Sequence, residues 1–267
     1  MQVMYDNAID FVKTYKDHPA VLAWGIGNEV YLNMATDEEK LAYSKLLETI
    51  CKDIKQIDSK HLLLSVEAWT FGLDWWETYV PSLDIYGLNS YGSGAALLSE
   101  ELTKRNIKKP YVVTEFGVTG EWDIKAQRHG VVIEPTDRDK YKAISDGYEG
   151  WIANKPNNLG LFVFHYSNSK DFIAPWLFTH FNGKTRPQYW AIREAYTGNK
   201  PINNVPQIQG FQLASAQGQS SIWVPVSLSV MDLEGDQLSV SFGYNQRTGS
   251  RKRRDQILPL QHRGDIN

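Results

Sequence analysis

Residues 22–30 read LAWGIGNEV, an apolar run that ends on an amide and a carboxylate side by side. A short apolar run bounded by polar residues is typical of a buried β-strand. A carboxylate at the end of such a strand costs free energy unless it is paired. Glu29 is therefore explained either by a neighbouring Lys or Arg that pairs with it, or by a functional site at the end of the strand.

Apolar runs of the same character recur along the chain, and helical patterns separate them. Further strands are expected at residues 61–68, 84–91, 110–117 and 159–167. Helices are expected at residues 4–17, 36–58, 95–105, 136–154 and 187–196. Thr36 is the expected N-cap of the second helix, and Glu39 completes a capping box there. Because continuously apolar strands alternate with helices, the pattern indicates a parallel sheet covered by helices.

Two parallel architectures fit this pattern, a doubly wound sheet and a (β/α)8 barrel. No glycine-rich phosphate loop follows the first strand, and neither G-x-G-x-x-G nor a P-loop occurs in the sequence. Polar side chains stand instead at the carboxyl ends of the expected strands: Asn28, Glu29, Glu67, Asn89, Tyr91, Glu115 and His165. Because the active sites of barrels lie at that end of the strands, the sequence favours a TIM barrel.

The character of the chain changes after Gly198. Pro201 and Pro206 indicate a linker, after which residues 221–230 and 236–245 alternate apolar and polar side chains. This alternation predicts an antiparallel hairpin with its turn at residues 234–236. The sequence therefore predicts two domains: a partial barrel at residues 1–198, and a linker with a partial β-module at residues 199–267.

The composition limits the classes of function. The 267 residues carry a formal net charge of −3, which argues against a general nucleic-acid binder. The sequence contains no run of eighteen consecutive apolar residues, so it predicts no membrane span. The six histidines show no metal-ligand spacing, and we expect no metal and no cofactor. Cys51 stands alone in a helical pattern and is expected to be buried.

Two of the expected strands end on a glutamate, in GNEV at residues 27–30 and in TEFG at residues 114–117. One such glutamate is explained about as well by an ion pair as by function. Two of them at the rim of one barrel can hold a glycosidic bond between them, one as acid and one as nucleophile. Glu29 and Glu115 are therefore the candidate catalytic residues.

These motifs resemble those of the glycoside hydrolases of clan A, the superfamily whose catalytic residues lie on barrel strands four and seven. Asn28-Glu29 after WGIG resembles the acid/base motif, and VTEFG at residues 113–117 resembles the nucleophile strand. The family 2 C-terminal barrel domain and its family 5 relatives look most similar. If LAWGIGNEV is the fourth strand, the strand at residues 110–117 is the seventh, as the resemblance requires. The resemblance covers about residues 1–198.

The resemblance implies a role for each residue of the site. Glu29 would be the acid/base and Glu115 the nucleophile of a retaining glycosidase acting on a β-linked oligo- or polysaccharide. Retention requires carboxylates about 5 Å apart. Asn28 would bind the sugar hydroxyl next to the anomeric carbon, and Tyr91, with Asn89 nearby, would hold the nucleophile.

Aromatic side chains in or beside the rim loops are candidate sugar platforms, although packing explains each one taken singly better than a sugar contact does. They are Trp69, Trp75, Trp76, Trp122 and Trp176. His165 stands where the clan often has a tryptophan, so it is a candidate for the first sugar subsite. For Glu67, a hydrogen bond to the sugar and a structural ion pair both remain open.

The strand count also implies that strands one to three are absent, so we expect a piece of a longer protein, weakly active or inactive by itself. Two alternatives to hydrolysis remain open: a transglycosylase that uses the same pair, and a non-catalytic carbohydrate-binding protein. The trailing module resembles Ig-like or fibronectin-like domains of secreted carbohydrate enzymes. Export of the full-length protein to the periplasm, cell surface or medium would agree with it. The sequence indicates no oligomeric state.

Overall fold

The computed structural model describes residues 2–125, 135–166, 178, 184–219, 221–245 and 257–261. The chain divides into two compact units. One comprises Met1–Gly120 and Asp146–His165, and the other comprises Glu121–Ser145 and Tyr166–Asn267. The candidate catalytic glutamates both belong to the first unit.

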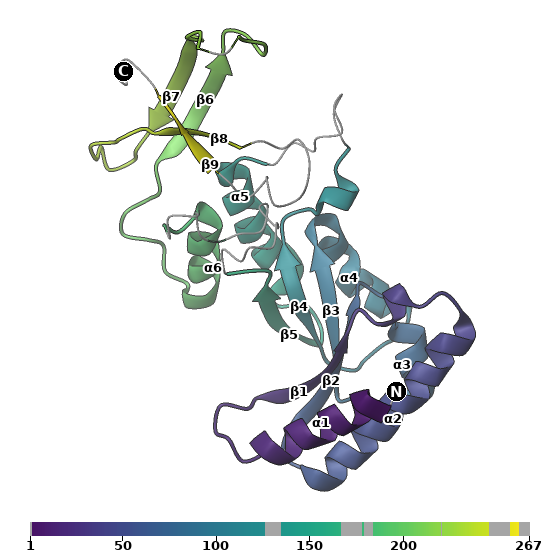
Figure 1. Ribbon diagram of the computed structural model, residues 1–267. Helices are drawn as coiled ribbons and strands as arrows, with labels where there is room; N and C mark the ends of the chain where they lie inside the picture. The colour runs from purple at the N-terminus through teal and green to yellow at the C-terminus, as the bar shows by residue number, and fades with distance from the viewer. Residues whose placement is uncertain are drawn as a thin grey trace. The chain divides into compact units, whose positions relative to one another are not determined.

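The first unit is a parallel sheet with helices between its strands (Figure 1). The strands are β1 (Ala23–Asn28), β2 (Leu62–Ala68), β3 (Ile85–Tyr91), β4 (Tyr111–Gly117) and β5 (Asn158–Val163). The helices are α1 (Gln2–Tyr15), α2 (Asp37–Ile57), α3 (Leu73–Tyr79) and α4 (Gly92–Lys104), with a 3-10 turn η1 (Tyr31–Asn33) and a π turn η3 (Tyr148–Ile152). The strands lie in the order β1-β2-β3-β4-β5, and every pairing is parallel. This five-stranded α/β sheet fits part of a TIM barrel, as the sequence predicted.

The predicted start of α2 is confirmed. The hydroxyl of Thr36 accepts from the backbone N–H of Glu39 at 3.2 Å, and the carboxylate of Glu39 accepts from the N–H of Thr36 at 3.2 Å. This reciprocal capping box satisfies backbone donors that a helix end leaves without a partner. The buried face of α2 includes Leu47, Cys51 and Ile54, and burial raises the pKa of the Cys51 thiol to about 12. The expected burial of this cysteine is therefore confirmed.

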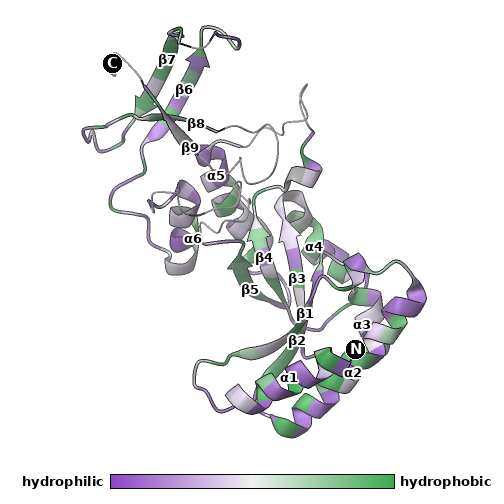
Figure 2. Ribbon diagram, viewed as in Figure 1, coloured by the Kyte–Doolittle hydropathy of each residue, from purple (hydrophilic) through white to green (hydrophobic). Residues whose placement is uncertain are grey.

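The core of the sheet lies along β3. Six of its seven residues are buried, and Figure 2 shows apolar residues on the strands β4 and β5. Trp76 of α3 stacks on Tyr86 with ring centroids 5.2 Å apart, and both side chains are fully buried. The first four residues of this strand are apolar, as expected of a strand buried on both faces, and its carboxyl end carries the buried polar residues Asn89 and Ser90.

The register aligns the polar strand ends. Asn28 of β1 lies beside Val66 of β2, and Asn89 of β3 lies beside Glu115 of β4. The β3–β4 register shifts between Leu88 and Asn89. As a result, polar residues from strands far apart in the sequence meet at the carboxyl ends of the strands.

Several element ends differ from those expected. The first strand stops at Asn28 because the next residue, Glu29, has a φ of 51°. The expected helix at residues 136–154 is divided into α5 (Asp137–Gly147) and the π turn η3. The helix expected at residues 187–196 is present as α6 (Pro187–Thr197), and Gly198 ends it with a left-handed φ of 68°.

The predicted hairpin of residues 221–230 and 236–245 is wrong. Strand β7 (Val226–Met231) pairs antiparallel with the upstream strand β6 (Gln207–Leu213), and β8 (Phe242–Asn245) pairs with β9 (Ile257–Leu260). A turn does follow β7: the Oδ1 atom of Asp232 accepts from the backbone N–H groups of Glu234 and Asp236 at 3.1 and 2.9 Å. Residues 207–213 read QIQGFQL, with polar side chains at three positions and a central glycine, and so gave little strand signal.

The second unit also includes the 3-10 turn η2 (Glu121–Asp123) and helix α6, and Tyr141 of α5 donates to Glu194 of α6 at 2.5 Å. Within the part of the chain that the structure describes, no helix is long and apolar enough to cross a membrane. The domain boundary predicted near residue 198 stays a prediction.

Candidate active site

Glu29 lies in a turn with an unusual backbone. Its φ is 51°, and that of Gly27 two residues earlier is 79°. A left-handed backbone costs a residue with a side chain about 1–2 kcal/mol. The turn is tied at both ends: the N–H of Glu29 donates to the carbonyl of Val66 at 3.0 Å, and Asn33 Nδ2 donates to the carbonyl of Glu29 at 2.8 Å. Such a conformation persists because its surroundings hold it.

Glu115 lies within a strand, next to a shift in register: Leu88 pairs with Val113 and Asn89 pairs with Glu115, so Thr114 is an extra residue on β4. Strand β4 pairs with β3 on one side and β5 on the other. Tyr91, the last residue of β3, donates its phenolic O–H to Glu115 Oε2 at 2.5 Å. This bond is the contact that the resemblance implied between these two residues. The ring of Tyr91 is in turn packed edge-on against Phe164, with centroids 6.1 Å apart.

Asn89 connects the two strand ends. Its Nδ2 donates to Glu29 Oε1 at 2.9 Å and to Asn28 Oδ1 at 3.1 Å. Its Oδ1 accepts from the hydroxyl of Thr114 at 2.7 Å, next to Glu115 in the sequence. The buried side chain of Asn89 thus links the end of β1 to the residue that precedes Glu115 on β4, and its predicted contact with the sugar stays a prediction.

The charge of Glu29 acts on the carboxylate of Glu115. Burial raises the pKa of Glu115, and the charge of Glu29 acts in the same direction, whereas hydrogen bonds from Tyr91 and Asn89 lower it. Burial and the bond to Glu115 raise the pKa of Tyr91, so its hydroxyl remains a proton donor. Glu115 is thus a half-buried carboxylate whose ionised form depends on two hydrogen-bond donors.

The remaining predicted residues of the first unit lie near these groups or beside their neighbours. Asn28 is exposed at the end of β1 and accepts from Asn89. Trp69 follows β2 with a φ of 44°, and its backbone N–H donates to the backbone carbonyl of Asn89 at 2.8 Å. His165 follows β5, and its ring lies 4.7 Å from that of Phe164, the partner of Tyr91.

The other four tryptophans predicted as sugar platforms differ in their surroundings. Trp76 is fully buried in the core, and Trp75 stacks between Tyr31 and Tyr79 at 6.3 and 5.8 Å. Trp122 is 66% exposed in η2 and belongs to the second unit. Trp176 falls outside the described residues. The platform roles of Trp69, Trp122 and Trp176 stay predictions.

Sequence reasoning missed Thr114, Asn33 and the bridging role of Asn89. Thr114 was visible in the quoted motif, but its partner lies 25 residues away in the sequence. Asn33 lies in the loop after Glu29 and carried no motif. A contact between side chains of different strands leaves no local pattern, so these links could be found from the structure alone.

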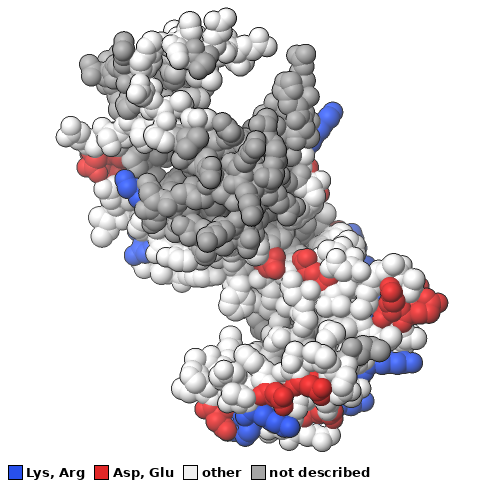
Figure 3. Space-filling model, viewed as in Figure 1, with Lys and Arg blue, Asp and Glu red and all other residues white. Residues whose placement is uncertain are grey.

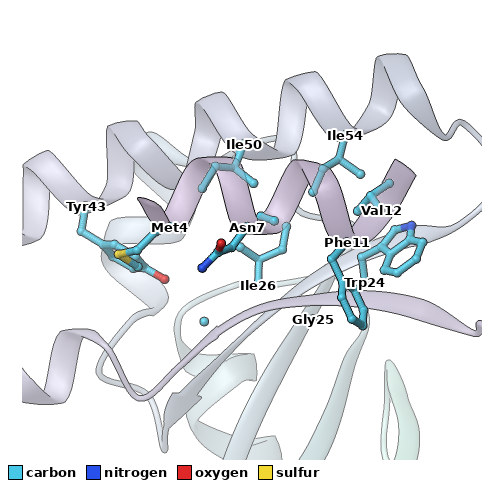
Figure 4. Close-up of a pocket in the computed structure, with 12 residues that line it drawn as sticks. Met4, Asn7, Phe11, Val12, Trp24, Gly25, Ile26, Tyr43, Ile50 and Ile54 are labelled. Atoms are coloured by element: carbon cyan, nitrogen blue, oxygen red, sulfur yellow. The ribbon is translucent and has the colours of Figure 1, made fainter. Parts of the chain in front are cut away.

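A separate apolar pocket of about 340 Å³ lies between α1, β1 and α2, lined among others by Phe11, Trp24, Ile26 and Ile54 (Figure 4). Neither Glu29 nor Glu115 lines it.

On the face in Figure 3, acidic and basic side chains of the described residues are interspersed. Among those residues no group of three or more His, Cys, Asp or Glu side chains could hold a metal ion.

A parallel α/β sheet with two linked carboxylates at the carboxyl ends of its strands is the arrangement found in barrel glycosidases. The family model "Glycosyl hydrolases family 2, TIM barrel domain" matches residues 1–141, and the chain belongs to this family. This family membership, expected from the resemblance, is confirmed. No curated protein matches the chain.

Solved structures share the fold at low sequence identity. Bacteroides uniformis β-glucuronidase 2, covalently bound to cyclophellitol-6-carboxylate aziridine, superposes with a TM-score of 0.59 at 15% identity over 77% of this chain and 26% of its own. Lactobacillus rhamnosus β-glucuronidase gives a TM-score of 0.50 at 19% identity, covering 73% of this chain and 35% of its own. A GH5_18 protein from Streptomyces cattleya, in complex with Manβ1-4GlcNAc, gives 0.50 at 12% identity, covering 74% and 54%. The chain therefore spans about a quarter to a half of these relatives.

Proposed function

We propose that this chain carries the two catalytic carboxylates of a retaining glycoside hydrolase that cleaves β-linked sugars. Glu115 is the nucleophile and Glu29 the acid/base. The observation that supports this most strongly is the side chain of Asn89, whose Nδ2 donates to Glu29 and whose Oδ1 accepts from Thr114, the residue before Glu115. A structural ion pair would need a cation at each glutamate, whereas here each glutamate accepts from a neutral donor.

The proposed reaction has two displacement steps. Glu29 gives its proton to the glycosidic oxygen while the bond between that oxygen and the anomeric carbon breaks, and a carboxylate oxygen of Glu115 bonds to that carbon. A water molecule then loses a proton to Glu29, attacks the anomeric carbon and releases Glu115. Each glutamate ends in the protonation state in which it began.

The neighbours of each glutamate suit these roles. The O–H of Tyr91 stabilises a negative charge on Glu115 before attack and again when the carboxylate leaves. Asn89 Nδ2 donates to the ionised form of Glu29, which is the form that accepts a proton from water. Asn28, exposed at the same rim, is the proposed partner of the sugar hydroxyl next to the anomeric carbon.

A covalent label tests the proposal. The full chain is incubated with dinitrophenyl β-glycosides that carry fluorine beside the anomeric carbon, in separate reactions for glucuronic acid, glucose, galactose and mannose. Fluorine slows both steps, and the activated leaving group speeds the first, so the glycosyl-enzyme accumulates. We expect mass spectrometry of peptides to find one sugar on Glu115, and no label on Glu115→Gln.

The outcomes separate the candidate functions. Label on another residue contradicts the proposed nucleophile. No label in any of the four reactions, after an incubation long enough for a weakly active chain, overturns the proposal for this chain by itself and favours a protein that binds sugar without turnover. If Glu115 is labelled, products from an unfluorinated substrate distinguish release to water from transfer to a second sugar. Glu77→Gln is the matched control, because Glu77 also accepts from a tyrosine, Tyr86, at 2.5 Å but lies away from the strand ends.

Residues 199–267 are proposed to be part of an Ig-like or fibronectin-like module. The two antiparallel pairs β6–β7 and β8–β9 support this, as do exposed apolar side chains such as Phe211 and Trp223 that a second sheet would cover. Limited proteolysis tests the boundary: cleavage between residues 198 and 207 is expected first. Primary cleavage inside β6 or β7 would contradict it.

A further inference from the structure

Glu67 is a fully buried carboxylate in β2, the strand next to β1. Both of its oxygens accept from backbone N–H groups. Oε2 accepts from Tyr31 at 2.7 Å, and Oε1 accepts from Ala68 at 2.8 Å. None of the ion pairs among the described residues includes Glu67. Its carboxylate is therefore used on the backbone of another segment.

That segment is the turn directly after Glu29. Tyr31 begins the 3-10 turn η1, and the preceding residue, Val30, provides no side-chain cap. The first N–H groups of a helical turn have no partner within the turn itself. Glu67 supplies the missing acceptor from the neighbouring strand, and its partners include the N–H of Leu32 as well as that of Tyr31.

Glu29, whose backbone is left-handed, is held by a hydrogen bond before the turn and by a buried side chain after it. Before the turn, the N–H of Glu29 is bonded to Val66, the residue that precedes Glu67. After it, the ring of Tyr31 is buried, with centroids 5.1 Å from Tyr43, and its hydroxyl lies 2.9 Å from that of Ser44. The bond from Tyr31 to Glu67 ties this anchored residue to the same strand that holds Glu29.

We infer that Glu67 is a positioning residue, whose carboxylate fixes the turn at residues 29–33 and thereby sets the direction in which Glu29 meets the glycosidic oxygen. The inference rests on the proposed function for its catalytic half. Its structural half, that Glu67 holds the turn, stands on the hydrogen bonds alone. Neither role open from the sequence, a bond to the sugar or an ion pair, uses the carboxylate in this way.

The pKa of Glu67 is raised, because burial and the charge of Glu29 raise it more than the N–H groups of Ala68, Tyr31 and Leu32 lower it. The hydrogen bonds from the turn thus offset part of the cost of burying this carboxylate.

The test compares two buried carboxylates that cap backbone N–H groups. Glu67→Gln keeps the size of the side chain but replaces one acceptor oxygen with an NH2 group that faces an N–H donor. Glu48→Gln is the matched control: Glu48 is 8% exposed and accepts from the N–H and hydroxyl of Ser82 at 3.1 and 2.9 Å. Both variants are made in the full chain.

The first readout needs no activity. Amide hydrogen exchange of residues 29–33 is expected to be about tenfold to a hundredfold faster in Glu67→Gln, the range for a lost hydrogen bond to a charged group. In Glu48→Gln these amides should exchange at the wild-type rate, and that of Ser82 should exchange faster. Unchanged exchange at residues 29–33 in Glu67→Gln overturns the inference whether or not the chain has activity.

The second readout is the dependence of kcat/KM on the leaving group. A phenyl leaving group needs the proton of the acid, whereas a dinitrophenyl group leaves without it. With the β-glycoside that labels wild type, Glu67→Gln should lose about tenfold to a hundredfold with the phenyl leaving group, and severalfold less with the dinitrophenyl group. Equal losses with both overturn the positioning role, because a general loss of structure affects both substrates alike.

A second variant covers the case in which Glu67→Gln does not fold. Asn33→Ala removes the other tie to the turn, and this side chain is exposed, so the core is unaffected. It should shift the exchange at residues 29–33 and the leaving-group ratio in the same directions; no shift in either overturns the inference. If no fluorinated glycoside labels wild type, the proposed function and the catalytic half of the inference fail together, and the exchange result still decides the structural half.

Discussion

The two candidate catalytic glutamates are held in opposite ways. Glu115 lies within β4, between two hydrogen-bonded strands, at a point where the register shifts against both of them. Glu29 lies beyond the last residue of β1, with a left-handed backbone, and β1 is at the edge of the sheet as described. The same type of side chain is thus presented once by a strand and once by a turn.

This difference fits the different tasks of the proposed roles. A nucleophile must meet one carbon from one direction, and a position inside a sheet provides that. An acid/base meets the leaving group first and water later, from a turn whose geometry depends on bonds to Val66 and Asn33. The comparison predicts that disturbance of β4 and of the β1 turn will have separable consequences.

The largest effect is expected from removal of the glutamates themselves. Glu115→Ala should lower kcat/KM by more than about 10⁴-fold, and Glu29→Ala by about 10²–10⁴-fold with a phenyl leaving group. Azide should rescue both, by opposite routes. In Glu29→Ala it attacks the glycosyl-enzyme from the face of the missing acid/base and gives the β-glycosyl azide; in Glu115→Ala it attacks from the face of the missing nucleophile and gives the α-anomer.

Product analysis by NMR measures the anomer directly. The same anomer from both variants would show that the two glutamates do not lie on opposite faces of the sugar. Glu77→Ala serves as the reference, and azide should have no effect on it.

A smaller effect is expected from the support of Glu115. Tyr91→Phe removes a charge-assisted hydrogen bond worth about 1.5–3 kcal/mol, so kcat should fall about tenfold to a hundredfold. Because this bond lowers the pKa of Glu115, the acid limb of the pH–rate profile should move to higher pH. Tyr86→Phe removes an equivalent bond to Glu77, and an acid limb that moves equally in both variants would contradict the specific role of Tyr91.

The β1 turn can be tested with two glycines of one strand. Gly27→Ala forces a side chain onto a backbone with φ 79°, with its Cβ 2.3 Å from the hydroxyl of Tyr43, and should destabilise the fold by about 1–3 kcal/mol. Gly25→Ala meets open space and should stay within about 0.5 kcal/mol of wild type. Urea unfolding measures both, and equal stabilities would mean that the turn is not constrained as described.

The smallest effect is a gain of stability. Because the pKa of Glu115 is raised in the fold, the folded chain binds this proton more tightly than the unfolded chain does. Its contribution to stability is complete below the ordinary glutamate range, about 4.3, and is lost as pH rises through the folded pKa. Glu115→Gln stays neutral, so its Tm at pH 7 should exceed that of wild type. A difference that does not shrink as pH falls toward 4 would contradict this origin.

Much of the first unit could be predicted from sequence because its signals are local. Five apolar runs predicted five strands, and Thr36 with Glu39 predicted the start of α2. Glu29 and Glu115 could be singled out because a charge that follows an apolar run is conspicuous. Their chemical roles stay predictions.

What could not be predicted depends on contacts between distant segments. Asn89 bonds to residues 60 and 61 positions away, and the β3–β4 register shifts at that residue. Alternation in a sequence identifies a strand but not its partner. The pairing of β7 with the polar strand β6 could therefore not be predicted. The buried cap by Glu67 joins strand and turn over 36 positions.

The amide of Asn89 has a further consequence for the stereochemistry of the proposed reaction. One rigid, planar group is bonded to Glu29 on one side and to the strand of Glu115 on the other, so it acts as a spacer between the two carboxylates. The gap between such carboxylates determines whether a glycosidase retains or inverts the anomeric centre. To redesign this sheet for the opposite stereochemical outcome, one would begin at residue 89 rather than at either glutamate.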